Sequence, residues 1–352
     1  HVFLDTIQYD KDVADKDINV EELYSGFHLL VRRKGRENNF KPILETIRDL
    51  MNTKTIIPKW MEDIFLGYGD PRQAEYTKLN DFKNVNVDMK DTFLNKEHYL
   101  ESVKINEYLP EELRNKDVKF DDSLSKKNKV RFTKRQVEAI YSGVHHGLTL
   151  IVGPPGTGKT DVAVQIISLL YHNFPNQRTL VITHSNNALN DIFEKITNLD
   201  INERYLLRLG MGEKDLNLEK DFSKTGRIDY MLGRRSELLA YVLSLANSLN
   251  IFTHQEYTCE TAMNFYNFHI KSRIDEYCSG SKVEFPFNNF IGDDSKPKEY
   301  INLIEQMFKE IEEIRAFELL RNNTERGNYL LTTQAKIIAM TCTYAALKRR
   351  DF

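Results

Sequence analysis

The sequence predicts an α/β protein whose parallel sheet carries a phosphate-binding loop and is interrupted by a large helical insertion. Three observations support this fold class. Strand-like and helix-like segments alternate between about residues 148 and 209, a glycine loop joins the first strand to the first helix, and the strand pattern returns near residue 336. Such alternation is typical of a parallel sheet with covering helices. A mixed α+β accessory region precedes the sheet.

The composition is that of a globular chain. Of the 352 residues, 41% are hydrophobic and 29% are charged, as in ordinary folded domains. No apolar run reaches the ~18 residues that a membrane helix needs, so we expect no membrane association. A net charge of -3 argues against a uniformly basic nucleic-acid-binding surface and leaves room for local basic patches. The three cysteines form no C-x-x-C pair, which fits neither a disulfide scaffold nor a zinc site.

Residues 1–125 are expected to form the accessory region. It combines a strand-like run at 27–31, an amphipathic helix at 40–51 and a turn at 67–71. We expect the helix to bury its apolar stripe. Residues from about 72 to 130 are polar and irregular, and we interpret them as linker and surface.

Residues 126–210 and 329–352 are expected to form one α/β domain. Its predicted elements are a short helix at 134–141, a buried strand at 148–152, a helix at 162–170, a strand at 179–183, a helix at 188–196, a short strand at 205–209 and a strand at 336–342. Connections in α/β units are usually ~2–6 residues long. We therefore interpret residues 211–328 as a helical insertion, with apolar helical repeats at 238–249 and 304–314.

The run 153–160, GPPGTGKT, matches the phosphate-loop pattern G-x-x-x-x-G-K-[ST] at every fixed position, between a predicted strand and a predicted helix. Glycines allow the backbone to wrap around a phosphate, and the helix N-terminus favours the same anion. Lys159 supplies a positive charge for the outer phosphates, and the Thr160 hydroxyl is a ligand for Mg²⁺. We predict nucleotide contacts at Gly153, Gly156, Thr157, Gly158, Lys159 and Thr160. The alternative is a glycine-rich turn without a ligand.

Two residues upstream of the loop are candidate contacts to the base. The amide of Gln136 can both donate to and accept from an adenine edge, which would favour ATP over other nucleotides. Arg131 is a weaker candidate that would flank the base. The alternative for Gln136 is an ordinary exposed polar residue on a short helix.

Short polar side chains follow two of the predicted strands. Ser185 and Asn186 come after the strand at 179–183, and Thr341 and Thr343 end the strand at 336–342. Ligands of parallel sheets collect at the carboxyl ends of strands, where such groups suit a sugar-phosphate backbone. They are equally good helix N-caps, and both interpretations stay open.

Several of these runs resemble a known family. Gln136, the loop 153–160 and the run 183–189 resemble motifs Q, I and Ia of superfamily-1 helicases, in the branch that includes the nonsense-mediated-decay helicase. Four runs resemble, more narrowly, intron-binding helicases of the spliceosome: Glu37–Lys41, Gly67–Pro71, Thr160–Phe174 and Lys336–Lys348.

The resemblance implies a fold, cofactors and site residues. The fold is an incomplete RecA-like first motor domain, and the cofactors are ATP and Mg²⁺. Implied ATP contacts extend from Gly156 to Asp161, with Arg131 beside the adenine. Implied RNA contacts lie at Ser185, Asn186 and Thr341 to Thr343.

The resemblance also implies an activity, a location and partners. It implies a nuclear ATP-dependent RNA helicase that engages the pre-mRNA intron, among the spliceosomal proteins of the intron-binding complex. The chain starts at His1 and holds neither the acidic motif II nor a second motor domain. We therefore expect it to be an internal stretch of a longer protein and to be inactive as an ATPase alone. A spliceosomal scaffold that uses nucleotide structurally, and another superfamily-1 RNA or DNA helicase, remain open.

Overall fold

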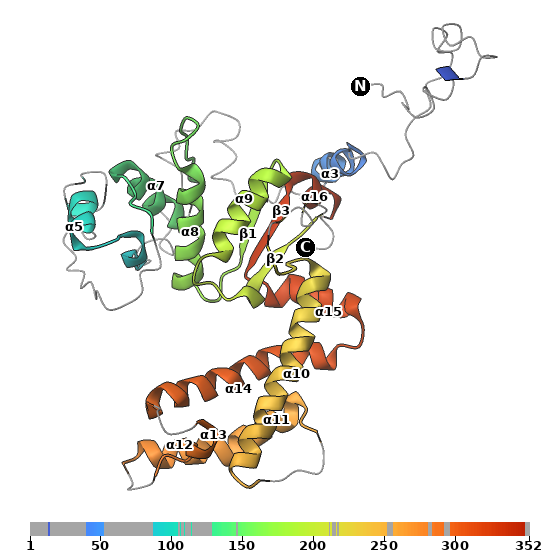
Figure 1. The fold of residues 1–352 in the computed structure, drawn as a ribbon. Coiled ribbons are helices and arrows are strands. Elements are labelled where there is room, and N and C mark those ends of the chain that lie inside the picture. The colour runs from blue at the N-terminus through green and yellow to red at the C-terminus, as the bar shows by residue number, and fades with distance from the viewer. Residues whose placement is uncertain are drawn as a thin grey trace. The chain divides into compact units, whose positions relative to one another are not determined.

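The chain forms two compact units, residues 1–54 and 55–352, in the computed structural model of the protein. Figure 1 labels their helices and strands. The structure describes residues 13–14, 40–52, 87–104, 106, 109, 114, 129–145, 147–210, 212, 216, 218–251, 256–280, 284–291 and 296–348. The predicted strand at 27–31 and the predicted turn at 67–71 lie outside these residues.

Helix α3 (Phe40–Asn52) of the first unit confirms the predicted helix, but its apolar stripe is not buried. Ile43, Leu44 and Ile47 are exposed, and Met51 is 81% exposed. An amphipathic pattern shows which residues share one face of a helix, whereas burial of that face needs a partner element. Nothing in the described part of this unit covers the stripe. The prediction of a buried stripe is therefore wrong for these residues.

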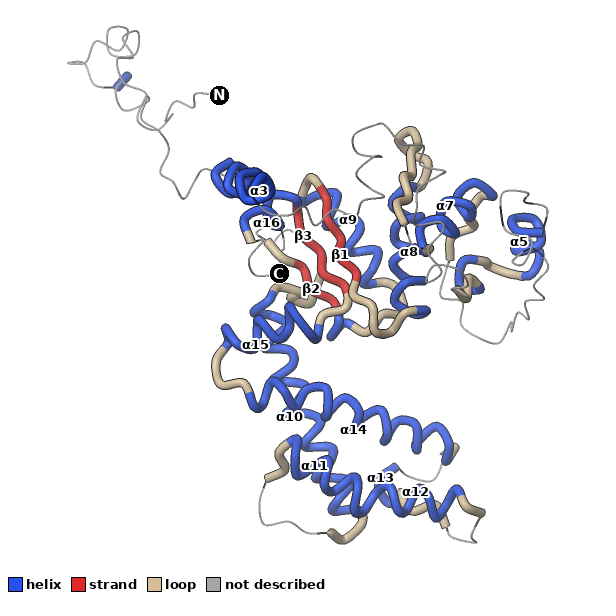
Figure 2. The backbone as a smooth tube through the Cα atoms, turned by 180° about the vertical axis from the view of Figure 1, so that it is seen from behind, coloured by secondary structure: helices blue, strands red, loops and turns tan. Residues whose placement is uncertain are grey.

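Among the residues that the structure describes, the second unit is built around a parallel sheet of three strands (Figure 2). The strands are β1 (Thr179–Thr183), β2 (Leu206–Arg208) and β3 (Ile337–Thr341). The order is β1-β3-β2, so the last strand in sequence lies in the middle. Thr183 pairs with Thr341, which brings the carboxyl ends of β1 and β3 level with each other. The predicted fold class, an incomplete parallel α/β sheet, is confirmed.

The helices that accompany the sheet are α7 (Lys134–Val144), α8 (Lys159–Asn173), α9 (Asn186–Thr197) and α16 (Cys342–Leu347). Alternate residues of a strand face opposite sides of the sheet. Ile337 and Ala339 pack with apolar residues of α8 and α9, whereas Ile338 and Met340 pack with the helices that lie between β2 and β3. β3 is thus covered on both faces, as a central strand of an α/β fold should be.

The predicted strand at 148–152 does not form in the part of the chain that the structure describes. Leu150 and Val152 are 77% and 94% exposed. The composition of this run fits a buried strand, but a strand also needs a hydrogen-bonded neighbour. β1 and β2 are each paired with β3, and none of the three strands pairs with this segment.

Residues 87–104 belong to a core, so their interpretation as surface linker is wrong. They form η5 (Lys90–Thr92), α5 (Lys96–Tyr99) and the π-helical turn η6 (Leu100–Lys104). Their apolar side chains pack against apolar residues of α7 and α8. The buried members from this segment are Val87, Met89, Phe93, Tyr99 and Val103. The segment therefore fixes the position of α7, which carries the predicted base contact.

The chain between β2 and β3 folds into helices. They are α10 (Lys224–Ser248), α11 (Cys259–Phe265), the π-helical turn η9 (Tyr266–Ile270), α12 (Lys271–Cys278), α13 (Asn288–Ile291), α14 (Pro297–Leu319), α15 (Asn323–Tyr329) and the π-helical turn η10 (Leu330–Gln334). Pro297 opens α14 at a position where its missing N–H costs nothing. Their core includes Val242 and Phe308 and is continuous with Met340 of the sheet. None of the described helices combines the length and the apolar character needed to cross a bilayer.

Charged side chains join α14 to the two residues that precede β2, Arg204 and Tyr205. Arg204 forms ion pairs with Glu310 at 3.6 Å and Glu313 at 3.0 Å, and all three side chains are at least three-quarters buried. The Tyr205 hydroxyl donates to Glu313 at 2.7 Å. Burial, followed by this hydrogen bond, raises the pKa of Tyr205 to about 12. Arg234 of α10 also contacts Glu310, so the cluster links both long helices to the sheet.

The three cysteines differ in accessibility, which predicts a labelling pattern. Cys278 and Cys342 are exposed and Cys259 is buried. Burial, reinforced by Glu318, raises the pKa of Cys259 to about 12. Because the thiolate is the reactive form, we expect Cys259 of the native protein to react with iodoacetamide at pH 8 at least ~100-fold more slowly than the other two. Mass spectrometry of tryptic peptides measures this, with urea-unfolded protein as control. Equal native rates would contradict the burial of Cys259.

Candidate functional site

The glycine loop adopts a backbone that only its glycines favour. Gly156 has φ +80° and Gly158, the N-cap of α8, has φ +71°. Both values lie in the left-handed region, which other residues rarely occupy. A Cβ at position 158 would also lie 2.7 Å from Nε2 of Gln136, so the Gln136 amide would have to shift. The loop thus leads directly into the N-terminus of α8.

Lys159 bridges the loop from the first turn of α8. Its Nζ donates to the carbonyl oxygens of Gly153 and Pro154, both at 2.7 Å. The Thr157 hydroxyl donates to the same Pro154 oxygen at 2.8 Å. The ammonium group therefore lies inside the concave side of the loop. There it can exchange two neutral carbonyls for phosphate oxygens, which bind an ammonium more strongly.

Gln136 lies where the sequence predicts, beside the loop. Thr133 and Gln136 form a capping box at the start of α7: the Gln136 Oε1 accepts from the Thr133 N–H at 2.8 Å. The Gln136 Nε2 donates to the Thr157 carbonyl at 3.0 Å. The amide is thus held between α7 and the loop. Its second N–H and a second oxygen lone pair can still serve a base edge.

These residues line one pocket of about 590 Å³, a size within the usual range for small-molecule sites. Its lining includes six of the predicted contacts, which are Gln136, Gly153, Gly156, Thr157, Gly158 and Lys159. Ile151, Val152 and Ala139 add apolar surface. The pocket therefore combines an apolar wall with polar groups that converge at one end.

Three predicted contacts do not line this pocket. Thr160 follows Lys159 in the first turn of α8. Asp161 forms an ion pair with Lys195 of α9, which joins the loop helix to the helix that follows β1. Arg131 lines a second pocket, and the two pockets share Thr133.

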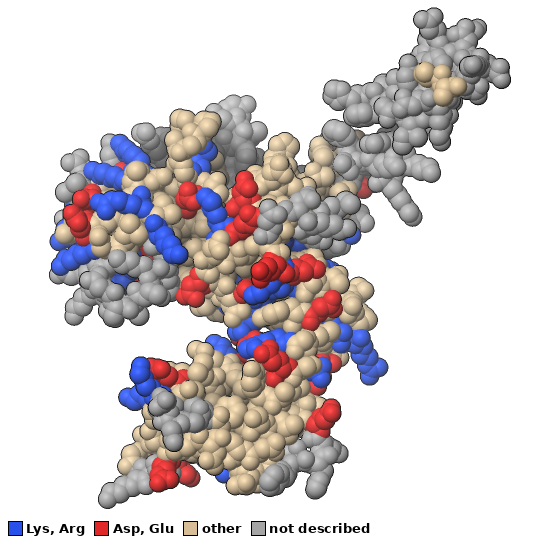
Figure 3. All heavy atoms as spheres, in the orientation of Figure 1, with Lys and Arg blue, Asp and Glu red and all other residues tan. Residues whose placement is uncertain are grey.

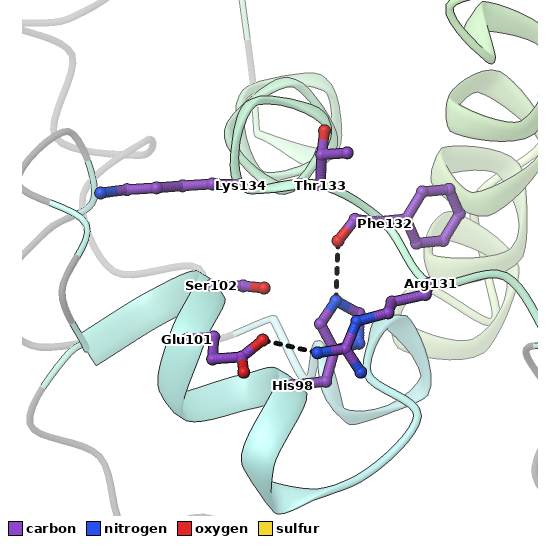
Figure 4. Close-up of a pocket in the computed structure, with 7 residues that line it drawn as sticks. All are labelled: His98, Glu101, Ser102, Arg131, Phe132, Thr133 and Lys134. Atoms are coloured by element: carbon purple, nitrogen blue, oxygen red, sulfur yellow. Dashed lines mark hydrogen bonds and ion pairs between the residues drawn. The ribbon is translucent and has the colours of Figure 1, made fainter.

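The second pocket, of about 260 Å³, is drawn in Figure 4. Arg131 pairs there with Glu101 of η6 at 2.5 Å. His98 accepts from the Leu94 N–H at Nδ1 (3.2 Å), so its Nε2 carries the proton and donates to the Phe132 carbonyl at 2.7 Å. The Arg131 guanidinium is thus held at Glu101 in the second pocket, and its role beside the base stays a prediction.

Basic side chains surround the start of α7. On the face shown in Figure 3, Lys and Arg gather over the part that holds α5 and α7. The exposed basic residues next to the start of α7 are Lys129, Arg131, Lys134 and Arg135. Both pockets open near this cluster. Its positive charge raises the local concentration of anionic ligands.

The donor set fits a nucleotide and its metal ion. A loop with two left-handed glycines, an inward ammonium and a helix N-terminus suits a triphosphate. Among the described residues no group of three His, Cys, Asp or Glu could hold a metal. A Mg²⁺ ion at Thr160 would thus need the nucleotide phosphates as further ligands, which is the usual way that this ion is bound.

The sheet edge brings together the other predicted residues. Ser185 caps α9 by accepting from the Ala188 N–H, and Thr341 caps α16 by accepting from the Tyr344 N–H. The helix-cap interpretation therefore holds for both hydroxyls. Asn186 and Thr343 are exposed at the same edge.

Sequence reasoning missed one residue at this edge, Arg208, whose side chain is fully buried and contacts Asn186. The available signal was a charged residue inside the apolar strand 205–209. Cys342, a further residue of this edge, is exposed.

Comparisons with known proteins agree with this geometry. A family model described as AAA domain matches residues 131–350. RNA helicase aquarius of Mus musculus is 43% identical over 99% of this chain and 29% of its own length. Pre-mRNA-splicing factor cwf11 of Schizosaccharomyces pombe is 26% identical over 99% of this chain and 30% of its own length. DNA polymerase alpha-associated DNA helicase A of Saccharomyces cerevisiae is 36% identical over 25% of this chain and 13% of its own length.

These findings confirm the resemblance to superfamily-1 helicases. The chain spans less than a third of the length of the first two relatives. The family match covers the phosphate loop, all three strands and the helices between β2 and β3. Since that match extends over more than half of the sequence, this chain belongs to the AAA domain family.

Proposed function

We propose that this chain is the ATP-binding part of an ATP-dependent RNA helicase that acts on the intron in the spliceosome. The observation that carries the proposal is the loop 153–158, with Lys159 bridging its concave side. Relatives named as an RNA helicase and as a pre-mRNA-splicing factor support the RNA and the spliceosomal context. The proposal includes a nuclear location, which a splicing context supports, and contacts with proteins of the intron-binding complex.

The residues of this chain have separable tasks. Lys159 holds the outer phosphates, and the backbone N–H groups of the loop and of the first turn of α8 hold the rest of the triphosphate. Gln136 aligns the base with the loop through its bond to Thr157. ATP, bound with Mg²⁺ at Thr160, supplies the phosphoanhydride whose hydrolysis releases the free energy for movement.

The structure also offers a connection from the loop to the sheet edge. Asp161 follows Lys159 on α8 and pairs with Lys195 of α9. Helix α9 begins at Asn186, one of the proposed RNA contacts. A shift of α8 on nucleotide binding would therefore pull on the helix that presents Asn186 to RNA.

The proposal is tested by ATP hydrolysis of the full-length protein with and without single-stranded RNA. We expect RNA to stimulate turnover, as in a motor whose two ligands are coupled. A protein that binds ATP but whose turnover ignores RNA would contradict the motor function and would favour a scaffold that uses nucleotide structurally.

Gln136→Ala tests the proposed contact of Gln136 with the base, independently of ATP hydrolysis. The substitution removes the capping box of α7 and the bond to Thr157, so we expect the Kd for ATP to rise about 5- to 10-fold. Ser142→Ala is the matched control, because Ser142 lies on the same helix and outside both pockets. Titration with a fluorescent ATP analogue measures both variants. An unchanged affinity of Gln136→Ala would remove this residue from the nucleotide site.

A further inference from the structure

A buried arginine lies directly behind the proposed RNA contact Asn186. Arg208 ends β2, and none of its side chain is exposed. Its Nη2 donates to the Oδ1 of Asn186 at 3.0 Å, and its Nε donates to the Oδ1 of Asn190 at 3.2 Å. Its Nη1 donates to the Leu209 carbonyl. The guanidinium thus binds two amide side chains in the first two turns of α9.

This contact decides which way the Asn186 amide points. A guanidinium group only donates hydrogen bonds, so the amide atom that faces it must be the oxygen. The Asn186 Nδ2 therefore points away from Arg208, and the side chain is exposed. An outward amide group with two N–H donors at a sheet edge suits an anionic oxygen.

Gly212 restrains the same side chain from another direction. A Cβ at position 212 would lie 2.4 to 2.7 Å from three atoms of the Asn186 side chain. The Gly212 carbonyl accepts from the Nδ2 of Asn190 at 2.9 Å. Any larger residue at 212 must therefore displace the Asn186 amide or the backbone that packs against it.

We propose that Arg208 and Gly212 are positioning residues that orient the Asn186 amide to donate to a phosphate oxygen of the RNA backbone. The inference rests on the proposed function, because it concerns the residues that hold the proposed RNA contact Asn186 in position. The hydroxyl oxygens of Ser185 and Thr341 accept from their own helices, whereas the Asn186 amide is oriented outward before RNA arrives. A donor held in its bound orientation loses little conformational entropy on binding.

A double-mutant cycle in the full-length protein tests whether Arg208 affects RNA binding through Asn186. The variants are Asn186→Ala, Arg208→Lys and the double variant, and the ligand is a fluorescent oligouridine measured by anisotropy. Lysine keeps the charge but cannot reach both amides as the planar guanidinium does. We expect each single variant to raise the RNA Kd about fivefold, which corresponds to the net contribution of one ordinary hydrogen bond. The double variant should bind no more weakly than Asn186→Ala, because Arg208 acts through Asn186. Losses that multiply, or an unchanged Kd for Arg208→Lys, would overturn the proposal.

Two further variants separate positioning from general stability. Gly212→Ala should also weaken RNA binding about fivefold and should not add to Asn186→Ala; it carries the test if Arg208→Lys fails to fold. Arg227→Lys is the matched control, since Arg227 is equally buried and donates to the main-chain oxygens of Asp221 and Glu203. It should lower thermal stability without changing the RNA Kd. A protein that binds no RNA would refute the proposed function and this inference together. RNA binding that is insensitive to Asn186→Ala would refute this inference alone.

Discussion

Replacing Lys159 with alanine is expected to abolish RNA-stimulated ATP hydrolysis by the full-length protein. The side chain crosses the concave side of the loop and bonds to Gly153 and Pro154. Its removal takes away the positive charge that would stabilise the outer phosphates during hydrolysis. Losing one such electrostatic contact typically lowers kcat by about 10²- to 10³-fold. A coupled-enzyme assay of ATP turnover with saturating RNA measures the effect.

The matched control for this experiment is Lys296→Ala. Lys296 is also an exposed lysine, but it lies at the start of α14 and pairs with Glu299. Its replacement should leave ATP turnover unchanged. Turnover by Lys159→Ala equal to that of the control would remove Lys159 from catalysis. If turnover is lost while splicing in a depleted and reconstituted extract survives, the scaffold function gains over the motor function.

Replacing Arg204 with alanine is expected to cause the largest loss of stability outside the apolar core. The substitution leaves Glu313 buried with Tyr205 as its neighbour and takes one of two cationic partners from Glu310. Removing one member of a buried ion pair typically costs about 3–5 kcal/mol. Because Arg234 still reaches Glu310, we expect the lower end of this range. Hydrogen exchange of α14 amides reports the effect locally, without assuming that the whole chain unfolds at once.

Arg315→Ala is the control for the junction between α14 and the sheet. Arg315 lies on the same helix and pairs with Glu312 at the surface. Exposed pairs of this kind are worth at most about 1 kcal/mol, so exchange along α14 should change little. If the two variants accelerated exchange equally, the buried cluster around Arg204 would not be what holds α14 to the sheet.

Local patterns predicted much of the fold. The strand at 179–183 and the helices that begin near 134 and 188 carry clear apolar periods, caps or both, and the structure contains them. The loop with Lys159 and Gln136 was also predictable, because its residues are close in sequence and each has a defined chemical task.

Long-range packing accounts for what the sequence did not predict. The run 148–152 is apolar enough for a strand, but strand formation depends on a neighbour that no local pattern specifies. The apolar residues of 87–104 follow no single period because three short irregular turns carry them, so their packing on α7 and α8 was not visible. Arg208 was missed for a related reason. Its proposed role depends on Asn186, which contacts it only in the folded chain.

A structure of the full-length protein with Mg²⁺ and a non-hydrolysable ATP analogue would show whether the loop 153–160 holds the triphosphate. We expect Nζ of Lys159 to leave the carbonyl oxygens of Gly153 and Pro154 and to contact the outer phosphates, while the backbone N–H groups of the loop surround the triphosphate. An analogue bound elsewhere, with Lys159 still bridging Gly153 and Pro154, would contradict this expectation.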